Sequence, residues 1–271
     1  MIVSTPRGPI FYTTSGRGPA CLVPSAIGTP PYERMIPVAL QERLRLVFVD
    51  LRGGGRSEGD AAALTFDDIA ADLDAVRRDL GLPRVAVMGH SILGLVAIEY
   101  GRRCAASVSH VVAVGAPPVG DMAVVGAAAQ EFFARDASEE RKSLLRANLA
   151  ALPADATSGR AMLAQAPMRF YDPRQDAAPL FAEAALRPVL LQRLLGSLTA
   201  GWDVRRGAFA GEPPLLLVHG RYDYVVPPGM WDGIPPALPR ATLVLFAKSS
   251  HHPFVDEPDR FAATVADWIT G

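Results

Sequence analysis

The stretch Arg84-Val-Ala-Val-Met-Gly-His-Ser-Ile-Leu-Gly94 carries the strongest indication of the fold of this chain. An apolar run typical of a buried strand passes through Gly89 and Ser91 into a helical segment with almost no loop between them. Glycine has no Cβ, so Gly89 and Gly94 permit the close approach of strand and helix that a sharp turn requires. The pattern predicts that the Ser91 hydroxyl stands above the end of the strand, at a helix N-terminus, where backbone N–H groups favour negative charge.

Short β-rich runs alternate with helical stretches from Ile10 to about Pro117, which is typical of a parallel sheet covered by helices on both faces. The strand candidates in this part of the chain are residues 20–24, 44–50, 84–88 and 108–114. One helix is expected from Phe66 to Leu80, because Thr65 is a suitable N-cap, and another from Ser91 to about Arg103. The sequence therefore predicts an α/β fold with a mostly parallel central sheet flanked by helices.

The character of the sequence changes between residues 119 and 208, where strand-like runs vanish and Ala, Leu and Arg dominate. The strand pattern resumes at residues 214–219 and 241–246, and residues 261–269 are expected to form a closing amphipathic helix. We therefore expect residues 1–118 and 209–271 to form the core domain, with residues 119–208 inserted as a helical lid.

Composition limits the partners of the protein. The chain has 27 Lys and Arg against 28 Asp and Glu, so it presents no basic surface for nucleic acid or an acidic membrane. It has no signal-peptide pattern at its start and no uninterrupted apolar run of about 18 residues. Cys21 and Cys104 are too few for a disulfide framework or a four-ligand zinc site. We expect a cytoplasmic protein that acts on a small molecule, without nucleic-acid or membrane partners, and the sequence leaves open whether it forms a homo-oligomer.

Three further segments follow predicted strands: residues 49–57, 220–228 and 248–258. Together with the turn at Ser91 they resemble the α/β-hydrolase superfamily, and within it the proline-iminopeptidase-like and esterase-like branch, over nearly the whole chain. The resemblance identifies the turn as a nucleophile elbow, with Leu93 where the second glycine of Gly-x-Ser-x-Gly usually stands. Residues 49–57 are similar to the family's Asp-x-Arg-Gly-x-Gly-x-Ser turn, in which Asp50 and Arg52 are expected to brace loops.

The resemblance also implies an acid and a base for Ser91. A serine hydroxyl needs a general base near neutral pH, and a partner must fix the tautomer of that base. The family order is serine, acid, histidine, which identifies Asp223 as the acid and His251 as the base. Asp121 is the second candidate for the acid. His252, the neighbour of the base, is expected to line the pocket, whereas His90 is expected to pack or form hydrogen bonds.

Acyl transfer passes through an oxyanion that N–H donors must stabilise. The resemblance implies that the backbone N–H of Ile92 is one donor and that a loop after an early strand supplies the second. That loop, residues 23–28, lacks the usual His-Gly pair; Ala26 is the preferred donor and Ser25 the alternative. Side chains proposed to contact substrate are Ser25, Phe132, Phe133, Tyr171, Trp202 and His252, although most aromatic side chains at helical spacing pack in a core.

These expectations lead to a serine hydrolase that cleaves a carboxylic ester or lactone of a small, apolar substrate through an acyl-enzyme on Ser91, without a cofactor and without a metal. An iminopeptidase-like amide hydrolase is the alternative, although Ile92 stands where those peptidases usually carry Trp. Such an enzyme needs an acidic group for a substrate ammonium, for which Glu131, Glu139, Glu140 and Glu183 are candidates. An acyltransferase or cyclase with the same triad, and a binding protein without turnover, also remain open.

Overall fold

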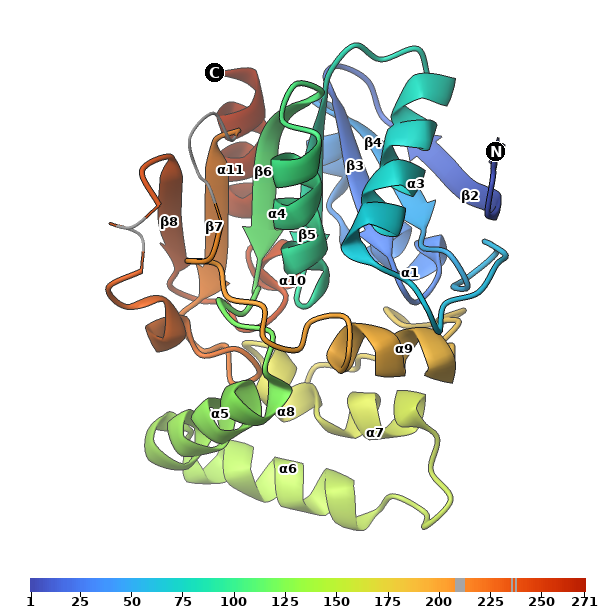
Figure 1. Ribbon diagram of the computed structural model, residues 1–271. Helices are drawn as coiled ribbons and strands as arrows, with labels where there is room; N and C mark the ends of the chain where they lie inside the picture. Colours follow the sequence, from blue (N-terminus) through green and yellow to red (C-terminus); the bar gives the residue numbers. More distant parts are fainter. Residues whose placement is uncertain (208–212, 235, 237) are drawn as a thin grey trace.

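The computed structural model describes residues 1–207, 213–234, 236 and 238–271, which contain an eight-stranded sheet in the order β1-β2-β4-β3-β5-β6-β7-β8 (Figure 1). The strands are β1 (Ile2–Thr5), β2 (Gly8–Ser15), β3 (Ala20–Ser25), β4 (Arg45–Asp50), β5 (Val85–His90), β6 (Val108–Val114), β7 (Leu215–Gly220) and β8 (Ala241–Phe246). β1 and β2 are antiparallel at one edge, and all neighbouring pairs from β4 to β8 are parallel. The predicted α/β fold with a mostly parallel sheet is confirmed.

Two apolar cores cover the two faces of the sheet. Successive residues of β5 alternate between them: Val85 and Val87 belong to the core beneath α3 (Phe66–Asp79) and α4 (Leu93–Arg103), and Ala86 and Met88 to the other. The second core is covered by α1 (Thr29–Met35), α2 (Val38–Gln41), α10 (Pro253–Asp256) and α11 (Pro258–Thr270). Figure 1 shows α3 and α4 on one face and α11 on the other, so both faces of the sheet are buried, as its apolar strands require.

The start of α3 follows from its sequence. The Thr65 hydroxyl accepts the Asp68 backbone N–H at 3.1 Å, and the Asp68 carboxylate accepts the Thr65 N–H at 3.0 Å. This reciprocal capping box satisfies two N–H groups that lack partners within the helix. The N-cap predicted at Thr65 is therefore confirmed.

Between β6 and β7 the described residues form α5 (Met122–Asp136), α6 (Glu139–Ala150), α7 (Ser158–Ala164), α8 (Ala166–Arg169) and α9 (Pro188–Leu195), which we call the inserted helices. They lie together beyond the carboxyl end of β6, across one end of the sheet (Figure 1). The segments that enter and leave them are paired: Gly120 N–H donates to the Trp202 carbonyl at 2.8 Å and Val204 N–H to the Pro118 carbonyl at 2.9 Å. Residues 208–212, where the predicted lid ends, lie outside the described residues, and the role of the inserted helices as a lid stays a prediction.

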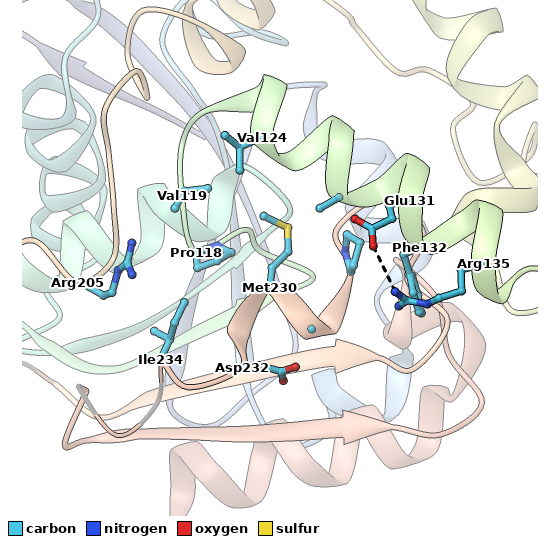
Figure 2. Close-up of a pocket in the computed structure, with 13 residues that line it drawn as sticks. Pro118, Val119, Val124, Glu131, Phe132, Arg135, Arg205, Met230, Asp232 and Ile234 are labelled. Atoms are coloured by element: carbon cyan, nitrogen blue, oxygen red, sulfur yellow. Dashed lines mark hydrogen bonds and ion pairs between the residues drawn. The ribbon is translucent and has the colours of Figure 1, made fainter.

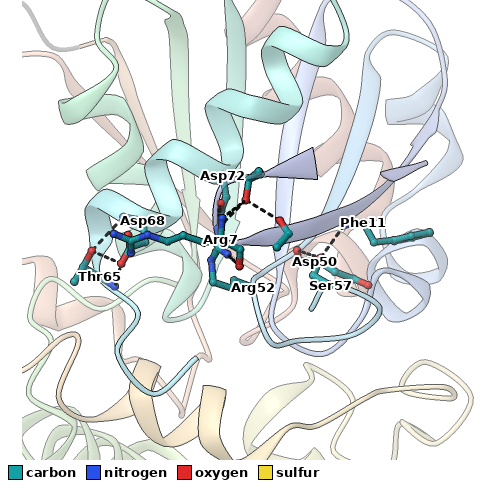
Figure 3. A network of polar contacts seen from close by, with 10 residues as sticks. Arg7, Phe11, Asp50, Arg52, Ser57, Thr65, Asp68 and Asp72 are labelled. Carbon is teal, nitrogen blue, oxygen red and sulfur yellow. Dashed lines mark hydrogen bonds and ion pairs between the residues drawn. The ribbon is translucent and has the colours of Figure 1, made fainter. Parts of the chain in front are cut away.

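The loop after β4 is held by a polar network (Figure 3). The Asp50 carboxylate accepts the Arg56 N–H at 2.7 Å, and the Asp50 carbonyl accepts the Ser57 hydroxyl at 2.7 Å. Arg52 is buried and donates to Asp72 of α3 at 3.1 Å. Asp50 and Arg52 thus brace loops, as predicted, and a Cβ at Gly55 would collide with the Asp50 carboxylate.

Candidate active site

Ser91 occupies a strained turn between β5 and α4. Its φ of 57° lies in the left-handed region, which residues with a side chain rarely adopt. Two hydrogen bonds hold it there: Ser91 N–H donates to the Val114 carbonyl of β6 at 2.8 Å, and the Ser91 carbonyl accepts the Gly94 N–H at 2.9 Å. The sharp strand-to-helix turn expected from the sequence is confirmed.

The glycines around Ser91 have separate packing roles. A Cβ at Gly89 would lie 2.0 Å from the Leu93 carbonyl oxygen, so only glycine permits this approach of strand and helix. A Cβ at Gly94 would lie 2.3 Å from the Cβ of Ala116, in the segment after β6. Leu93 itself is buried in the core. The close contact therefore falls on Gly94, one residue later than the usual pattern.

Asp223 and His251 meet at the ends of two neighbouring strands. Asp223 follows β7, His251 follows β8, both are buried, and His251 Nδ1 lies 2.9 Å from Asp223 Oδ2. Asp223 Oδ1 accepts the N–H groups of Val225 and Val226 at 2.9 and 2.8 Å. Since the carboxylate accepts a hydrogen bond from Nδ1–H, the lone pair of the imidazole lies on Nε2, which is buried and has no hydrogen-bond partner among the described residues. This is the tautomer that a general base requires.

His90 connects the segment of His251 to α1. Its Nε2 lies 2.9 Å from the His251 carbonyl oxygen, and its Nδ1 lies 3.1 Å from the Tyr32 hydroxyl. A carbonyl only accepts, so Nε2 carries the proton and Nδ1 accepts from Tyr32. Burial holds the pKa of His90 well below its usual range. His90 is therefore a neutral hydrogen-bonding residue, as the sequence led us to expect.

The end of α8 is bonded to the segment that carries His251. The Arg169 carbonyl accepts the His251 N–H at 3.0 Å and lies 3.2 Å from His252 Nδ1. The Ser250 hydroxyl lies 3.0 Å from the Met168 carbonyl and 2.7 Å from that of Tyr222. Serine at position 250, where the family usually has glycine, thus supplies a polar link to α8.

Asp256 adds a second link between these segments. Its two carboxylate oxygens accept the Tyr171 N–H at 3.0 Å and the Ser250 N–H at 2.8 Å. Burial raises the pKa of Asp256 to about 7. Sequence motifs gave no signal for this contact, because the residues that it joins are more than eighty positions apart.

The two predicted oxyanion donors lie just after β3 and β5, which are neighbouring parallel strands. Ala26 follows β3 and is buried, and Ile92 is the N-cap of α4. Within the described residues neither N–H donates to a backbone carbonyl. The hydroxyl of Ser25 donates to the Gly28 carbonyl at 2.6 Å and accepts the Ile27 N–H at 3.2 Å, so it already has partners within its own loop.

The remaining predicted contact residues are dispersed. Phe132 and Phe133 of α5 pack against Tyr224, with ring centroids 5.1 and 5.2 Å apart. Trp202 donates to Glu99 of α4 at 2.9 Å. Tyr171 is 41% exposed and lies against Tyr222, with centroids 5.5 Å apart.

His252 and Asp121 complete the set of predicted residues. His252 is buried and stacks on Phe170, with ring centroids 4.7 Å apart. It contacts the rings of His90 and His251 as well, at 4.8 and 5.3 Å. Asp121, the second candidate for the acid, is exposed and caps α5 by accepting the Ala123 N–H at 2.9 Å. The structure therefore brings Asp223, and not Asp121, to His251.

A cavity of about 600 Å³ lies between α5 and the 3-10 helix Pro228–Trp231 (Figure 2). Phe132 and Met230 line it, beside an ion pair of 3.4 Å between Glu131 and Arg135. Phe132 and Glu131, a candidate for a substrate ammonium, belong to its lining, whereas Asp223 and His251 do not. The cavity is therefore separate from the Asp223 and His251 pair.

No group of three or more His, Cys, Asp or Glu side chains in residues 1–207, 213–234, 236 and 238–271 is arranged to hold a metal ion. Across the same part of the chain, every helix is too short or too polar to cross a membrane.

Comparisons with known proteins identify the family of the chain. The chain is 28% identical over 270 residues to the AB hydrolase superfamily protein YclE of Bacillus subtilis (strain 168), covering 96% of this chain and 95% of that protein. It is 30% identical over 239 residues to a pimeloyl-(acyl-carrier protein) methyl ester esterase of Nitrosomonas europaea, covering 83% and 85%. The solved structure of a proline iminopeptidase of Mycobacterium smegmatis has a similar fold, with a TM-score of 0.76 at 19% identity over 99% of this chain and 97% of that one. The model of the alpha/beta hydrolase fold family matches residues 21–258, and the chain therefore belongs to that family.

Proposed function

We propose that this hydrolase is a serine esterase or lactonase that forms an acyl-enzyme on Ser91. The observation that carries the proposal is the 2.9 Å contact between His251 Nδ1 and Asp223 Oδ2, which leaves Nε2 free to accept a proton. The strained turn at Ser91 and the esterase-named relatives support it. We further propose that Asp223 fixes the orientation of His251 and stabilises its charged form.

The proposed reaction has two halves. His251 Nε2 takes the proton of the Ser91 hydroxyl as its oxygen attacks the substrate carbonyl, and the carbonyl electrons move to an oxyanion that faces the N–H groups of Ile92 and Ala26. The oxyanion collapses, the bond to the alcohol oxygen breaks, and His251 returns the proton to that oxygen. Water then attacks the acyl-enzyme with His251 as base, and the acid leaves as Ser91 regains its proton. In a lactone the alcohol stays part of the product.

We also propose that the inserted helices act as a lid over this site. The support is the set of hydrogen bonds from the end of α8 to Ser250, His251 and His252. A lid bonded to the base in this way would exclude water from the acyl-enzyme step and shape the space for the acyl group.

The ion pairs of the candidate glutamates favour an ester substrate over a peptide with a free amino terminus. The glutamates considered for a substrate ammonium each form an ion pair within the chain: Glu131 with Arg135, Glu139 with Lys142, Glu140 with Arg174, and Glu183 with Arg34. All four glutamates are exposed on the surface. Among the described residues, none of these four glutamates is therefore without an ion-pair partner that a substrate ammonium would have to displace.

Labelling by a fluorophosphonate serine probe, with hydrolysis of p-nitrophenyl acetate in parallel, tests the proposal. Wild type should label and turn over, whereas Ser91→Ala and His251→Ala should do neither. If Ser91→Ala labels and hydrolyses like wild type, the proposal fails. Hydrolysis of proline p-nitroanilide would favour the iminopeptidase instead, and transfer of the acyl group to added hydroxylamine in preference to water would indicate an acyltransferase.

A further inference from the structure

Arg169 brings a positive charge to the proposed active site. It is the last residue of α8, and its carbonyl oxygen accepts the His251 N–H at 3.0 Å, which fixes its backbone beside the proposed base. Its guanidinium interacts electrostatically with Asp223, and its charge contributes to the lowered pKa values of His90 and His252. The backbone of Arg169 thus lies against the segment of the proposed base, and its charge acts on the groups around His251.

This guanidinium is short of partners. It offers five N–H donors, but its single side-chain hydrogen bond runs from Nη2 to Gln165 Oε1 at 3.3 Å. Nε is buried and has no partner among the described residues. No Asp or Glu in that part of the chain forms an ion pair with Arg169. Burial lowers its pKa to about 10, so the side chain remains charged at neutral pH.

The side chains around His252, the neighbour of the proposed base, are apolar. His252, whose Nδ1 contacts the Arg169 carbonyl, is enclosed by the rings of Phe170, Phe181 and Phe254, at centroid distances of 4.7, 5.8 and 5.5 Å. A buried charge without a partner destabilises a protein, and an anion that pairs with it removes that cost. These apolar rings, together with a guanidinium that has no ion-pair partner among the described residues, fit a ligand that has an apolar chain and a single negative group.

We propose that Arg169 binds a carboxylate of the substrate, so that the ester or lactone cleaved at Ser91 carries a free carboxylate. The inference rests on the function proposed above and names its substrate class. A planar guanidinium matches a carboxylate through two parallel N–H···O bonds. Phosphate shares this geometry, but its second charge would call for a further cation. The apolar substrate expected from the sequence is thus refined to an apolar chain with one anionic group.

Two series of esters test this inference. The monomethyl esters of dicarboxylic acids from succinate to suberate are compared with methyl esters of monocarboxylic acids of the same chain length, by methanol release. Wild type should favour the carboxylate series in kcat/KM by about ten- to a hundredfold, as expected for a hydrogen bond to a charged group. Arg169→Gln should abolish this ratio, and Arg169→Lys, which keeps the charge, should restore part of it.

Arg174→Gln is the matched control, since Arg174 lies in the same segment but is exposed and donates to Glu140 at 3.0 Å. Its ratio should equal that of wild type. If Arg169 instead only balances the charge of Asp223, Arg169→Gln should lower kcat/KM for both ester series equally and leave their ratio unchanged. That result would overturn the inference.

The anion itself is tested by competition. Free glutarate should slow fluorophosphonate labelling of Ser91 in wild type but not in Arg169→Gln, and stronger protection by inorganic phosphate would argue against a carboxylate. Failure here is distinct from failure of the proposed function. Ser91-dependent hydrolysis without a preference for the charged series refutes the substrate class alone, whereas hydrolysis that persists in Ser91→Ala refutes the function.

Discussion

The imidazole of His90 lies against that of His251, with ring centroids 4.7 Å apart, and its Nε2 donates to the His251 carbonyl at 2.9 Å. The residue that precedes the proposed nucleophile thus holds the backbone of the proposed base. Tyr32, which donates to His90 Nδ1, extends this connection to the helix after the predicted oxyanion loop. Three segments of the proposed site are therefore joined by two buried hydrogen bonds.

Removal of the hydrogen bond from His90 to the His251 carbonyl should lower kcat more than it raises KM. His90→Leu loses the N–H that holds the His251 carbonyl, whereas His90→Gln keeps a donor. We expect kcat of the Leu variant to fall about tenfold below that of the Gln variant, which corresponds to one hydrogen bond. Steady-state kinetics on an ester substrate measure this difference. Equal kcat values for the two variants would show that His90 acts only by packing.

Asp223→Asn should leave the fold intact and lower kcat by about 10³- to 10⁴-fold, because an amide can stabilise the wrong tautomer of His251. Asp121→Asn is the control, since asparagine caps a helix as well as aspartate does. Its kcat should match that of wild type. A large loss in Asp121→Asn with a small one in Asp223→Asn would reverse the assignment of the acid.

Gly89→Ala should destabilise the protein by about 3 kcal/mol, because the added Cβ meets the Leu93 carbonyl at 2.0 Å. Gly126→Ala is a matched control within α5. A Cβ at Gly126 has no atom within 4 Å, so this change should raise the free energy of unfolding by about 1 kcal/mol through helix propensity. Urea unfolding of both variants tests whether the turn at Ser91 tolerates any side chain at position 89.

The free energy of unfolding should fall as the pH drops below about 6. Burial lowers the pKa of His219 to about 4, and the pKa values of His90 and His252 lie well below their usual range. Each histidine takes up a proton only when the chain unfolds, so acid favours the unfolded state. Asp256 has the opposite effect, because its raised pKa of about 7 lets the folded state hold a proton that the unfolded state has lost.

His219 takes up a proton when the chain unfolds between pH 5 and 6, so the slope of the free energy of unfolding against pH should be smaller in His219→Leu than in wild type, by about 1 kcal/mol per pH unit. The substitution breaks no hydrogen bond, since neither ring nitrogen of His219 has a partner among the described residues. Urea unfolding across this pH range measures the slope. A slope unchanged in His219→Leu would mean that His219 is charged in the folded protein.

The parts of the fold and site that sequence could predict are those with local patterns. The turn at Ser91, the N-cap at Thr65 and the strand-borne positions of Asp223 and His251 each depend on a short motif or on alternating burial. The contact of Arg169 with His251 joins residues more than eighty positions apart, and no motif marks it. The choice of aromatic residues as substrate contacts stays a prediction, because sequence spacing does not give their packing partners: Phe132 and Phe133 both lie against Tyr224.

The paired segments at Gly120 and Val204 have a consequence for protein engineering. Because the chain enters and leaves the inserted helices at one hydrogen-bonded point, we expect that these helices can be exchanged for those of a relative without altering the spacing of the sheet strands. The graft must bring its own carbonyl acceptors for Ser250 and the His251 N–H, which Met168 and Arg169 supply here. We therefore expect a graft to transfer substrate specificity only if it also supplies the two backbone carbonyl groups that hold His251 in place.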